Sequence, residues 1–123
     1  MLPESERLRK DALFQRTYAA KRTISTPIAS LYAIRRFPNS SPRLPLVGFV
    51  VGKKVHLKAT SRNLIKRRLR EAYRLLRQEM SELDQWYTLV WVAREKINTA
   101  SWKEIQKNLR EMIISINSKY GHN

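Results

Sequence analysis

The order of the predicted elements indicates an α+β sandwich in which helices pack against one mixed sheet. Two strand-like apolar segments, residues 46–55 and 86–93, alternate with two long helical patterns in the second half of the 123-residue chain. A hydrophobic content of 42% with three Trp argues for a packed core and against a disordered basic tail. We assign Trp86, Trp91 and Trp102 to that core, because each sits in an apolar pattern. At this length we expect one domain, residues 1–123, with a core from about 8 to 117 and flexible ends.

The first half of the chain predicts one helix, one strand and one loop. Residues 1–10 resemble a loose basic lead-in. Asp11 is predicted to N-cap a helix that runs to about residue 21, since its carboxylate can accept from the first free N–H groups. Phe14 and Tyr18 are four residues apart and share a face of that helix. Residues 28–36 are rich in strand formers, and residues 38–45 (PNSSPRLP) predict a loop.

The second half predicts two strands and two helices. Residues 46–55 favour a buried strand that leads into Lys53 and Lys54, and Ser61 is predicted to cap a helix that runs to about residue 80. Residues 86–93 (WYTLVWVA) are apolar on both faces, which is typical of a central strand. Ser101 and Glu104 form a capping box for the last helix. Its packed stripe is predicted to be Ile105, Leu109, Met112, Ile113 and Ile116.

The segment SRNLIKRRLREAYR, residues 61–74, concentrates positive charge on one side of its predicted helix. At about 100° per residue, a cationic arc centred near Asn63 opposes an apolar arc. The cationic arc is Lys66, Arg67, Arg70, Arg74 and Arg77, and the apolar arc is Ile65, Leu69, Ala72 and Leu76. Like charges four residues apart destabilise a helix by roughly 0.2–0.5 kcal/mol per pair, so a polyanionic partner would relieve the repulsion along this arc. The alternative, a solvated basic face, usually carries interspersed acids.

Charge is also unevenly distributed along the whole chain. Residues 1–80 contain 19 Lys and Arg against 5 acids, whereas residues 81–123 contain 6 against 5. A net charge of +15 attracts nucleic acid or an anionic membrane at long range. Because the apolar helix faces are assigned to the core, nucleic acid is favoured over a membrane surface. Nothing in the sequence directs the chain out of the cytoplasm.

Side chains for catalysis are scarce, whereas side chains for RNA recognition are abundant. There is no Cys, and His56 and His122 have no neighbouring carboxylate to orient them, so we predict neither catalytic nor metal-binding residues. Gly48 and Gly52 lie within a predicted strand, where they permit close backbone approach. The aromatic side chains admit two interpretations, either stacking on unpaired bases or ordinary core packing. Those concerned are Phe14, Tyr18 and Tyr32.

Four pieces of the chain, in order, resemble the bacterial ribonuclease P protein subunit over roughly residues 8–116. The first is Leu8, Asp11 and Phe14 on the first helix, and the second is the strand GFVVGKKV, residues 48–55. The third, KATSRNLIKRRLREAYR at residues 58–74, matches the arginine-rich signature of the family and is the most specific. The last is the closing strand, entered from Asp84 and ending at Ala93.

This resemblance implies an α-β-β-β-α-β-α fold with a four-stranded mixed sheet and a left-handed β-α-β crossover, of the ribosomal protein S5 domain 2-like class. It also implies a partner, a catalytic RNA subunit bound 1:1, which holds Mg²⁺ and removes the 5′ leader of precursor tRNA; neither DNA nor a membrane is expected as a partner. The residues implied to face that RNA are Arg62, Asn63, Lys66, Arg67, Arg70 and Arg74. Those implied to line a cleft for the single-stranded leader are Phe14, Tyr18, Tyr32, Val50, Lys53 and Lys54.

The sequence departs from the family pattern in two places. The signature usually reads Arg-Asn-Arg, and here Leu64 is its third residue, so one RNA contact is missing or moved. A glycine common before the helix is absent, and His56 and Leu57 occupy that connection, which leaves the conformation of residues 55–60 open.

Two other functions remain as alternatives to the ribonuclease P subunit. A structural RNA-binding protein, such as a ribosomal protein of similar build, would have the same net charge. A DNA-binding protein could place residues 61–80 in a major groove, but base reading there needs short polar side chains, and this face offers only Asn63 among its cations.

Overall fold

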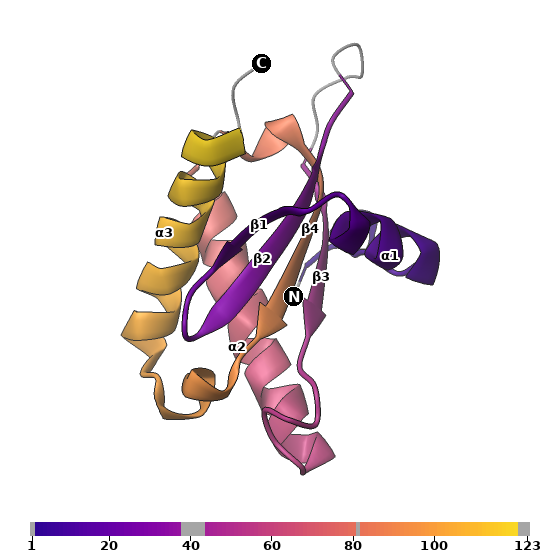
Figure 1. Cartoon of the computed structure of the whole chain (residues 1–123). Helices are drawn as coiled ribbons and strands as arrows, with labels where there is room; N and C mark the ends of the chain where they lie inside the picture. Colours follow the sequence, from indigo (N-terminus) through magenta and orange to yellow (C-terminus); the bar gives the residue numbers. More distant parts are fainter. Residues whose placement is uncertain (1, 38–43, 81, 121–123) are drawn as a thin grey trace.

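The computed structural model describes residues 2–37, 44–80 and 82–120, which form a four-stranded mixed sheet and three helices (Figure 1). Along the chain come α1 (Asp11–Ala19), β1 (Arg22–Ser25), β2 (Ala29–Arg35), β3 (Leu46–Val50), α2 (Ala59–Arg77), β4 (Trp86–Ala93) and α3 (Trp102–Tyr120). This order confirms the predicted α+β class. His122 and residues 38–43 of the predicted loop lie outside the described residues.

The sheet has the strand order β1-β2-β4-β3, with β4 antiparallel to β2 and parallel to β3. The bounds and the central position predicted for β4 are confirmed. A parallel pair needs a crossover connection, and α2 provides it between β3 and β4. Near Ile34 the register shifts so that Tyr87 is an extra residue in β4. This bulge turns the side chains of Trp86 and Thr88 to opposite faces of the sheet. Trp86 Nε1 accordingly donates to Asn117 of α3, whereas the hydroxyl of Thr88 bonds to Thr17 of α1.

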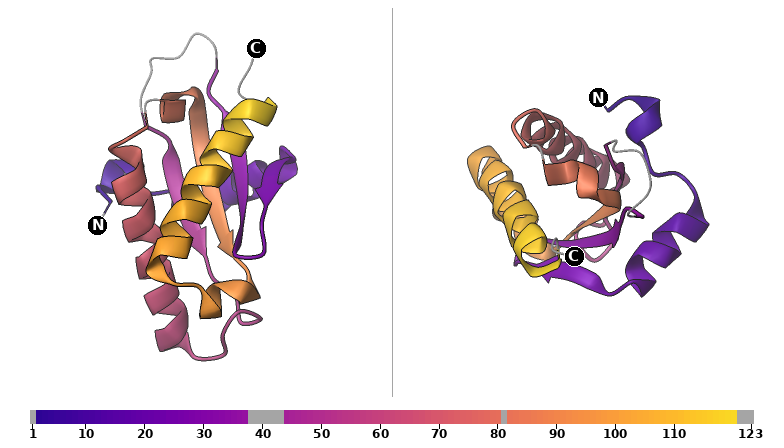
Figure 2. Two further views of the ribbon diagram at one scale, coloured as in Figure 1. Left: turned by 90° about the vertical axis from the view of Figure 1, so that its left-hand side faces the viewer. Right: turned by 90° about the horizontal axis from the view of Figure 1, so that it is seen from above.

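Helices cover both faces of the sheet, but unequally. Figure 2 shows α2 and α3 side by side over one face, with α1 on the other. The core lies under α2 and α3, where Leu69 and Tyr73 of α2 and Leu109 and Ile113 of α3 are fully buried. The predicted stripe on α3 is confirmed, because all five of its residues are buried. The capping box is confirmed as well, since Ser101 N–H donates to Glu104 Oε1 (3.3 Å) and Glu104 N–H to Ser101 Oγ (3.1 Å).

Two predicted helix caps are wrong. α1 begins at Asp11 itself, so this carboxylate lies in the first turn of the helix and does not cap it. Its negative charge there interacts favourably with the positive end of the helix dipole. α2 begins two residues before Ser61 and ends at Arg77, three residues earlier than predicted. Its start is set by Arg62, whose guanidinium donates to the carbonyls of His56 (2.9 Å) and Leu57 (2.7 Å). These two hydrogen bonds hold the connection between β3 and α2, residues 55–60, whose conformation could not be predicted from the sequence.

Three further expectations differ from the structure. Strand β3 ends at Val50 and not at residue 55, because the chain turns there and Val55 N–H donates to Gly52 O (3.0 Å). The residues alone did not predict β1, which has four residues and follows α1 directly through Lys21 at φ 59°. Trp102 is 39% exposed and does not belong to the core, whereas Trp86 and Trp91 are fully buried.

The N-terminal segment is not a loose lead-in, since it packs along β3. Leu2 and Leu8 are buried, and Leu8 N–H donates to Val47 O (2.9 Å) in a parallel bridge between Arg7 and Val47. This segment therefore extends the sheet beyond β3 at one point. It also brings Arg7 and Arg9 next to Lys66 and Arg70 of α2.

Candidate nucleic-acid interface

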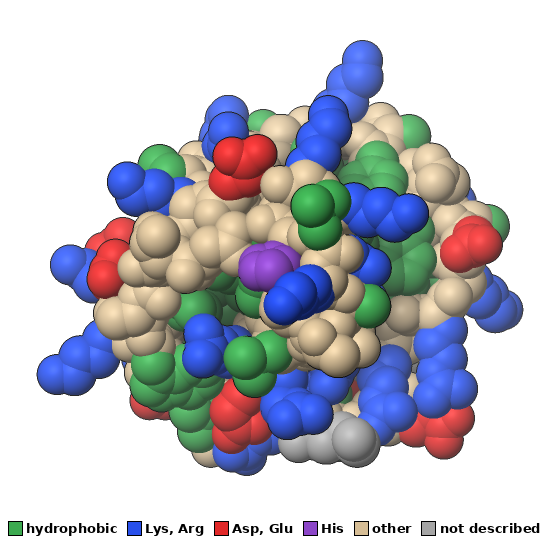
Figure 3. All heavy atoms as spheres, turned by 90° about the horizontal axis from the view of Figure 1, so that it is seen from below, with side chains coloured by type: hydrophobic (Ala, Val, Ile, Leu, Met, Phe, Trp, Pro, Cys, Tyr) green, Lys and Arg blue, Asp and Glu red, His purple; other side chains and the backbone are tan. Residues whose placement is uncertain are grey.

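The two sides of α2 differ in the predicted way. The buried side is Ile65, Leu69, Ala72, Tyr73 and Leu76, which confirms the packing arc. On the cationic arc, Asn63 and Arg67 are exposed, and Lys66, Arg70 and Arg74 are partly exposed. Figure 3 views the molecule from the end where α2 begins, and Lys and Arg side chains gather around the histidine of that face. A pocket in the connection before α2 is lined by Lys53, Lys54, Val55, His56 and Leu57.

Ion pairs neutralise the second half of the cationic arc. Arg74 donates to both oxygens of Glu71, with a shortest distance of 2.6 Å, and these bonds lower the pKa of the Glu71 carboxyl. Arg77 lies 3.2 Å from Glu6, and the two side chains are only 18% and 10% exposed. Of the residues expected to face RNA, Arg74 is therefore already paired in the free protein. Among the residues that the structure describes, no ion pair involves the first half of the arc, around Arg67 and Arg70.

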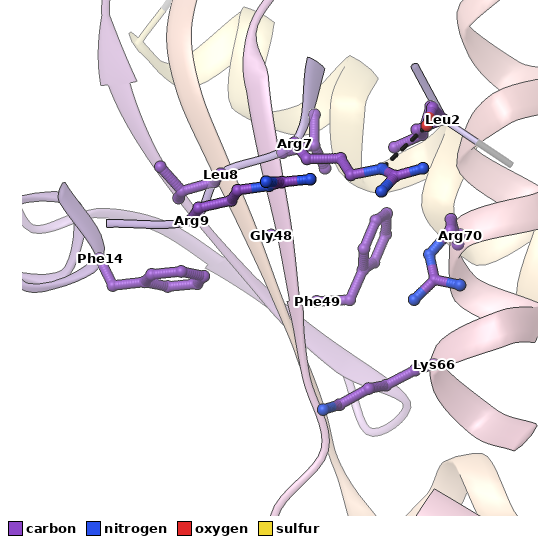
Figure 4. A pocket seen from close by; sticks show the side chains of 10 residues that line it. Leu2, Arg7, Leu8, Arg9, Phe14, Gly48, Phe49, Lys66 and Arg70 are labelled. Carbon is purple, nitrogen blue, oxygen red and sulfur yellow. Dashed lines mark hydrogen bonds between the residues drawn. The ribbon is translucent and has the colours of Figure 1, made fainter. Parts of the chain in front are cut away.

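A cavity of about 230 Å³ lies where the first half of the arc meets the N-terminal segment (Figure 4). Its cations are Lys66 and Arg70 from α2 and Arg7 and Arg9 from the N-terminal segment. Its apolar lining is Leu2, Leu8, Phe14, Val47 and Phe49, together with Gly48. No acid is among the described residues that line it. Four cations over an apolar wall suit a phosphate with an attached sugar or base.

Arg7 and Arg9 were not predicted as site residues. Arg7 is held in place, because its Nε donates to the carbonyl of Leu2 (2.9 Å). Arg9 pairs with Glu4 at 3.0 Å, but both side chains are largely exposed, so this pair contributes little to stability. The signal in the sequence was the apolar pair Leu2 and Leu8, whose burial attaches the segment to β3.

The three aromatic residues are partly exposed on the sheet face that carries α1. Phe14 rests on Gly48, where a Cβ would come within 2.5 Å of the ring, and this confirms the close approach predicted for that glycine. Tyr18 meets the ring of Tyr32 edge to face, with 5.0 Å between the centroids. Burial, and secondarily Tyr32, raises the pKa of the Tyr18 hydroxyl, which keeps it neutral.

The remaining residues expected in the cleft continue from these rings. Val50 follows Gly48 by two residues in β3, so both face the same way, and Val50 is partly exposed. Lys53 and Lys54 are exposed in the turn after β3. We call this set, Phe14, Tyr18, Tyr32, Val50, Lys53 and Lys54, the aromatic strip. The strip adjoins the cavity at Phe14, which is the one residue of the strip that also lines the cavity.

Two properties of the described part of the chain complete the picture. No group of three or more His, Asp and Glu residues lies close enough there to hold a metal ion. None of the helices there is long and apolar enough to span a membrane.

Comparisons with known proteins agree on one family. The Ribonuclease P family model matches residues 2–117. The ribonuclease P protein component of Clostridium novyi is 31% identical over 112 residues, which cover 91% of this chain and 94% of the relative. That of Alkaliphilus oremlandii is 32% identical over 111 residues, 90% of each chain.

Solved structures agree on the fold. The RNase P protein of Staphylococcus aureus superposes with a TM-score of 0.74 at 24% identity, over 89% of this chain and 94% of that one. The RNase P protein of Thermotoga maritima gives a TM-score of 0.65 at 22% identity, over 90% and 94%. With a family model that spans nearly the whole chain and relatives above 30% identity, the chain belongs to the ribonuclease P protein family.

Proposed function

We propose that this chain is the protein subunit of ribonuclease P and assists the magnesium-dependent endonucleolytic removal of the 5′ leader from precursor tRNA. In this proposal the active site belongs to the catalytic RNA subunit, which binds one copy of the protein in the cytoplasm. The relatives named as protein components of the enzyme support the subunit role.

One observation carries the proposal: a cationic cavity, with no acid among the described residues that line it, adjoins a strip of half-exposed aromatic rings at Phe14. Lys and Arg side chains neutralise phosphates without regard to sequence, which suits a large RNA partner. Aromatic rings stack most readily on bases that are unpaired, which suits a single-stranded leader. The first half of the α2 arc would bind the RNA subunit, and the aromatic strip would hold the leader beside it.

Magnesium is assigned to the RNA partner in this proposal. Mg²⁺ prefers oxygen ligands in octahedral geometry, and no described part of the chain gathers three carboxylates or imidazoles. The ring of His56 is engaged locally, since its Nδ1 accepts from Lys58 N–H (3.3 Å). The chain's own contribution is thus to bind phosphates, to orient the leader and to lower the repulsion between two RNAs.

The test is cleavage of precursor tRNA by the cognate RNA subunit at low magnesium, with and without the protein. The proposal predicts that the protein increases cleavage, and that the gain disappears for a substrate whose leader is base-paired. Equal cleavage with and without protein would contradict it. Sequencing the RNA that copurifies with the protein separates the alternative role, because ribosomal RNA as the bound species would indicate a structural ribosomal protein.

A further inference from the structure

Helix α1 rests on the sheet through three side-chain contacts, one on each of three adjacent strands. The contacts are Phe14 on Gly48 of β3, Thr17 on Thr88 of β4, and Tyr18 on Tyr32 of β2. Within α1 only Thr17 is fully buried, whereas Gln15 and Arg16 beside it are exposed. The centre of this helix–sheet contact is therefore a polar side chain at a place where an apolar residue is the usual choice.

The hydrogen bond between Thr17 and Thr88 has only one possible direction. Thr17 Oγ1 donates its single proton to the carbonyl of Leu13 (2.7 Å). The 2.8 Å contact between the two hydroxyls therefore requires Thr88 to be the donor. Both residues are fully buried, so the bond exchanges no partner with water. It fixes α1 to one point of β4 directionally, which an apolar contact would not do.

Gly48 fixes the place of the Phe14 ring on the sheet. A Cβ at this position would lie 2.5 Å from Cζ and 2.6 Å from Cε1 of Phe14, well inside van der Waals contact. The Phe14 ring thus lies against the backbone of β3, and any larger residue at position 48 must displace this ring from its place on the sheet. The same prediction of close backbone approach is wrong for Gly52, which lies after the end of β3, has open space around its Cβ position and imposes no such limit.

We propose that Thr88 and Gly48 are positioning residues for leader binding. Thr88 sets the position of α1 through Thr17, and Gly48 sets the position of the Phe14 ring; together they fix how the rings of Phe14 and Tyr18 lie relative to the open sheet surface at Val50. This inference rests on the proposed role of the aromatic strip. Neither residue touches the leader in this account, so Thr88 acts through α1 and Gly48 acts through the ring of Phe14.

Thr88→Val is the sharper test, because it removes the donor and nearly preserves the shape. Thr17 keeps its bond to Leu13, so no buried donor is left unpartnered, and we expect the fold to hold. We expect the complex with the RNA subunit to lose about 5-fold in affinity for precursor tRNA, the lower end of what one base–aromatic stack contributes. Affinity for mature tRNA and for the RNA subunit should not change. Amide hydrogen exchange should rise in α1 and not in α3.

Matched variants complete the experiment. Thr99→Val makes the same chemical change at an exposed residue and should leave every reading unchanged. Gly48→Ala should act in the same direction as Thr88→Val, and Thr88→Val decides alone if that variant does not fold. If Tyr18→Ala lowers precursor affinity while Thr88→Val does not, the leader strip stands and the positioning inference is overturned. If Tyr18→Ala has no effect either, the leader strip and the inference fail together.

Discussion

Replacing Arg70 by alanine should weaken RNA binding without unfolding the protein. Arg70 lines the cationic cavity, and the structure shows no ion pair for it among the described residues. Its loss relieves the like-charge contact with Lys66 four residues earlier, worth about 0.2–0.5 kcal/mol, and gives up some packing of its aliphatic stem. These small opposing effects should leave the melting temperature within about 2 °C of the parent protein.

The RNA affinity of this variant should change with salt by a calculable amount. One lost phosphate contact makes the slope of log K against log[salt] shallower by about 0.7–0.9, so the loss of affinity between 50 and 200 mM salt shrinks by about 2.5- to 3.5-fold. Filter binding to the RNA subunit across that range measures the slope. Lys119→Ala, on the last turn of α3, is the matched control and should leave it unchanged. An unchanged slope for Arg70→Ala, or a strongly lowered melting temperature, would refute the assignment of Arg70 to phosphate binding.

Three further predictions follow from the ion pairs and the aromatic strip. Arg77→Met leaves the Glu6 carboxylate buried without its cation, so urea unfolding should show a loss of about 3 kcal/mol, whereas the double variant Glu6→Gln/Arg77→Met should recover part of it. Arg74 lowers the pKa of Glu71, so the stability from this pair is complete above the unfolded carboxyl pKa of about 4.3 and is lost as the pH falls through the lower folded value; Glu71→Gln should remove that part of the acid dependence, and an unaltered pH profile would contradict the pairing. Tyr18→Ala should weaken binding of precursor tRNA by roughly 1–3 kcal/mol and leave mature tRNA unaffected, and equal losses for both RNAs with a sharp drop in melting temperature would instead assign the ring to the core.

Local sequence patterns predicted the parts of the fold that depend on strong periodicity. The doubly apolar run of β4, the stripe of α3 and its capping box are all local signals, and all three are confirmed. The strand β1 was not predicted, because four residues are too few to show a periodic pattern. Its pairing with β2 depends on tertiary contacts that a local pattern does not contain. The caps at Asp11 and Ser61 failed because helix starts are also set by distant or backward contacts, such as the bonds from Arg62 to two preceding carbonyls.

The candidate site was predictable along α2 but not across the chain. Helical spacing placed Lys66, Arg67 and Arg70 on one side, because that geometry is local. It could not show that Glu6, some seventy residues earlier, neutralises Arg77, nor that Arg7 and Arg9 complete the cavity. Both facts follow from the packing of the N-terminal segment against β3, which depends on the burial of Leu2 and Leu8 and not on any charge pattern.

Site-directed cross-linking tests the central claim most directly. A photoreactive benzophenone side chain is placed at position 18 in one variant and at position 67 in another, and each is assembled with the RNA subunit and precursor tRNA. The account predicts cross-links from position 18 to leader nucleotides and from position 67 to the RNA subunit. Cross-links from position 18 to the RNA subunit alone, with the leader unmodified, would contradict it.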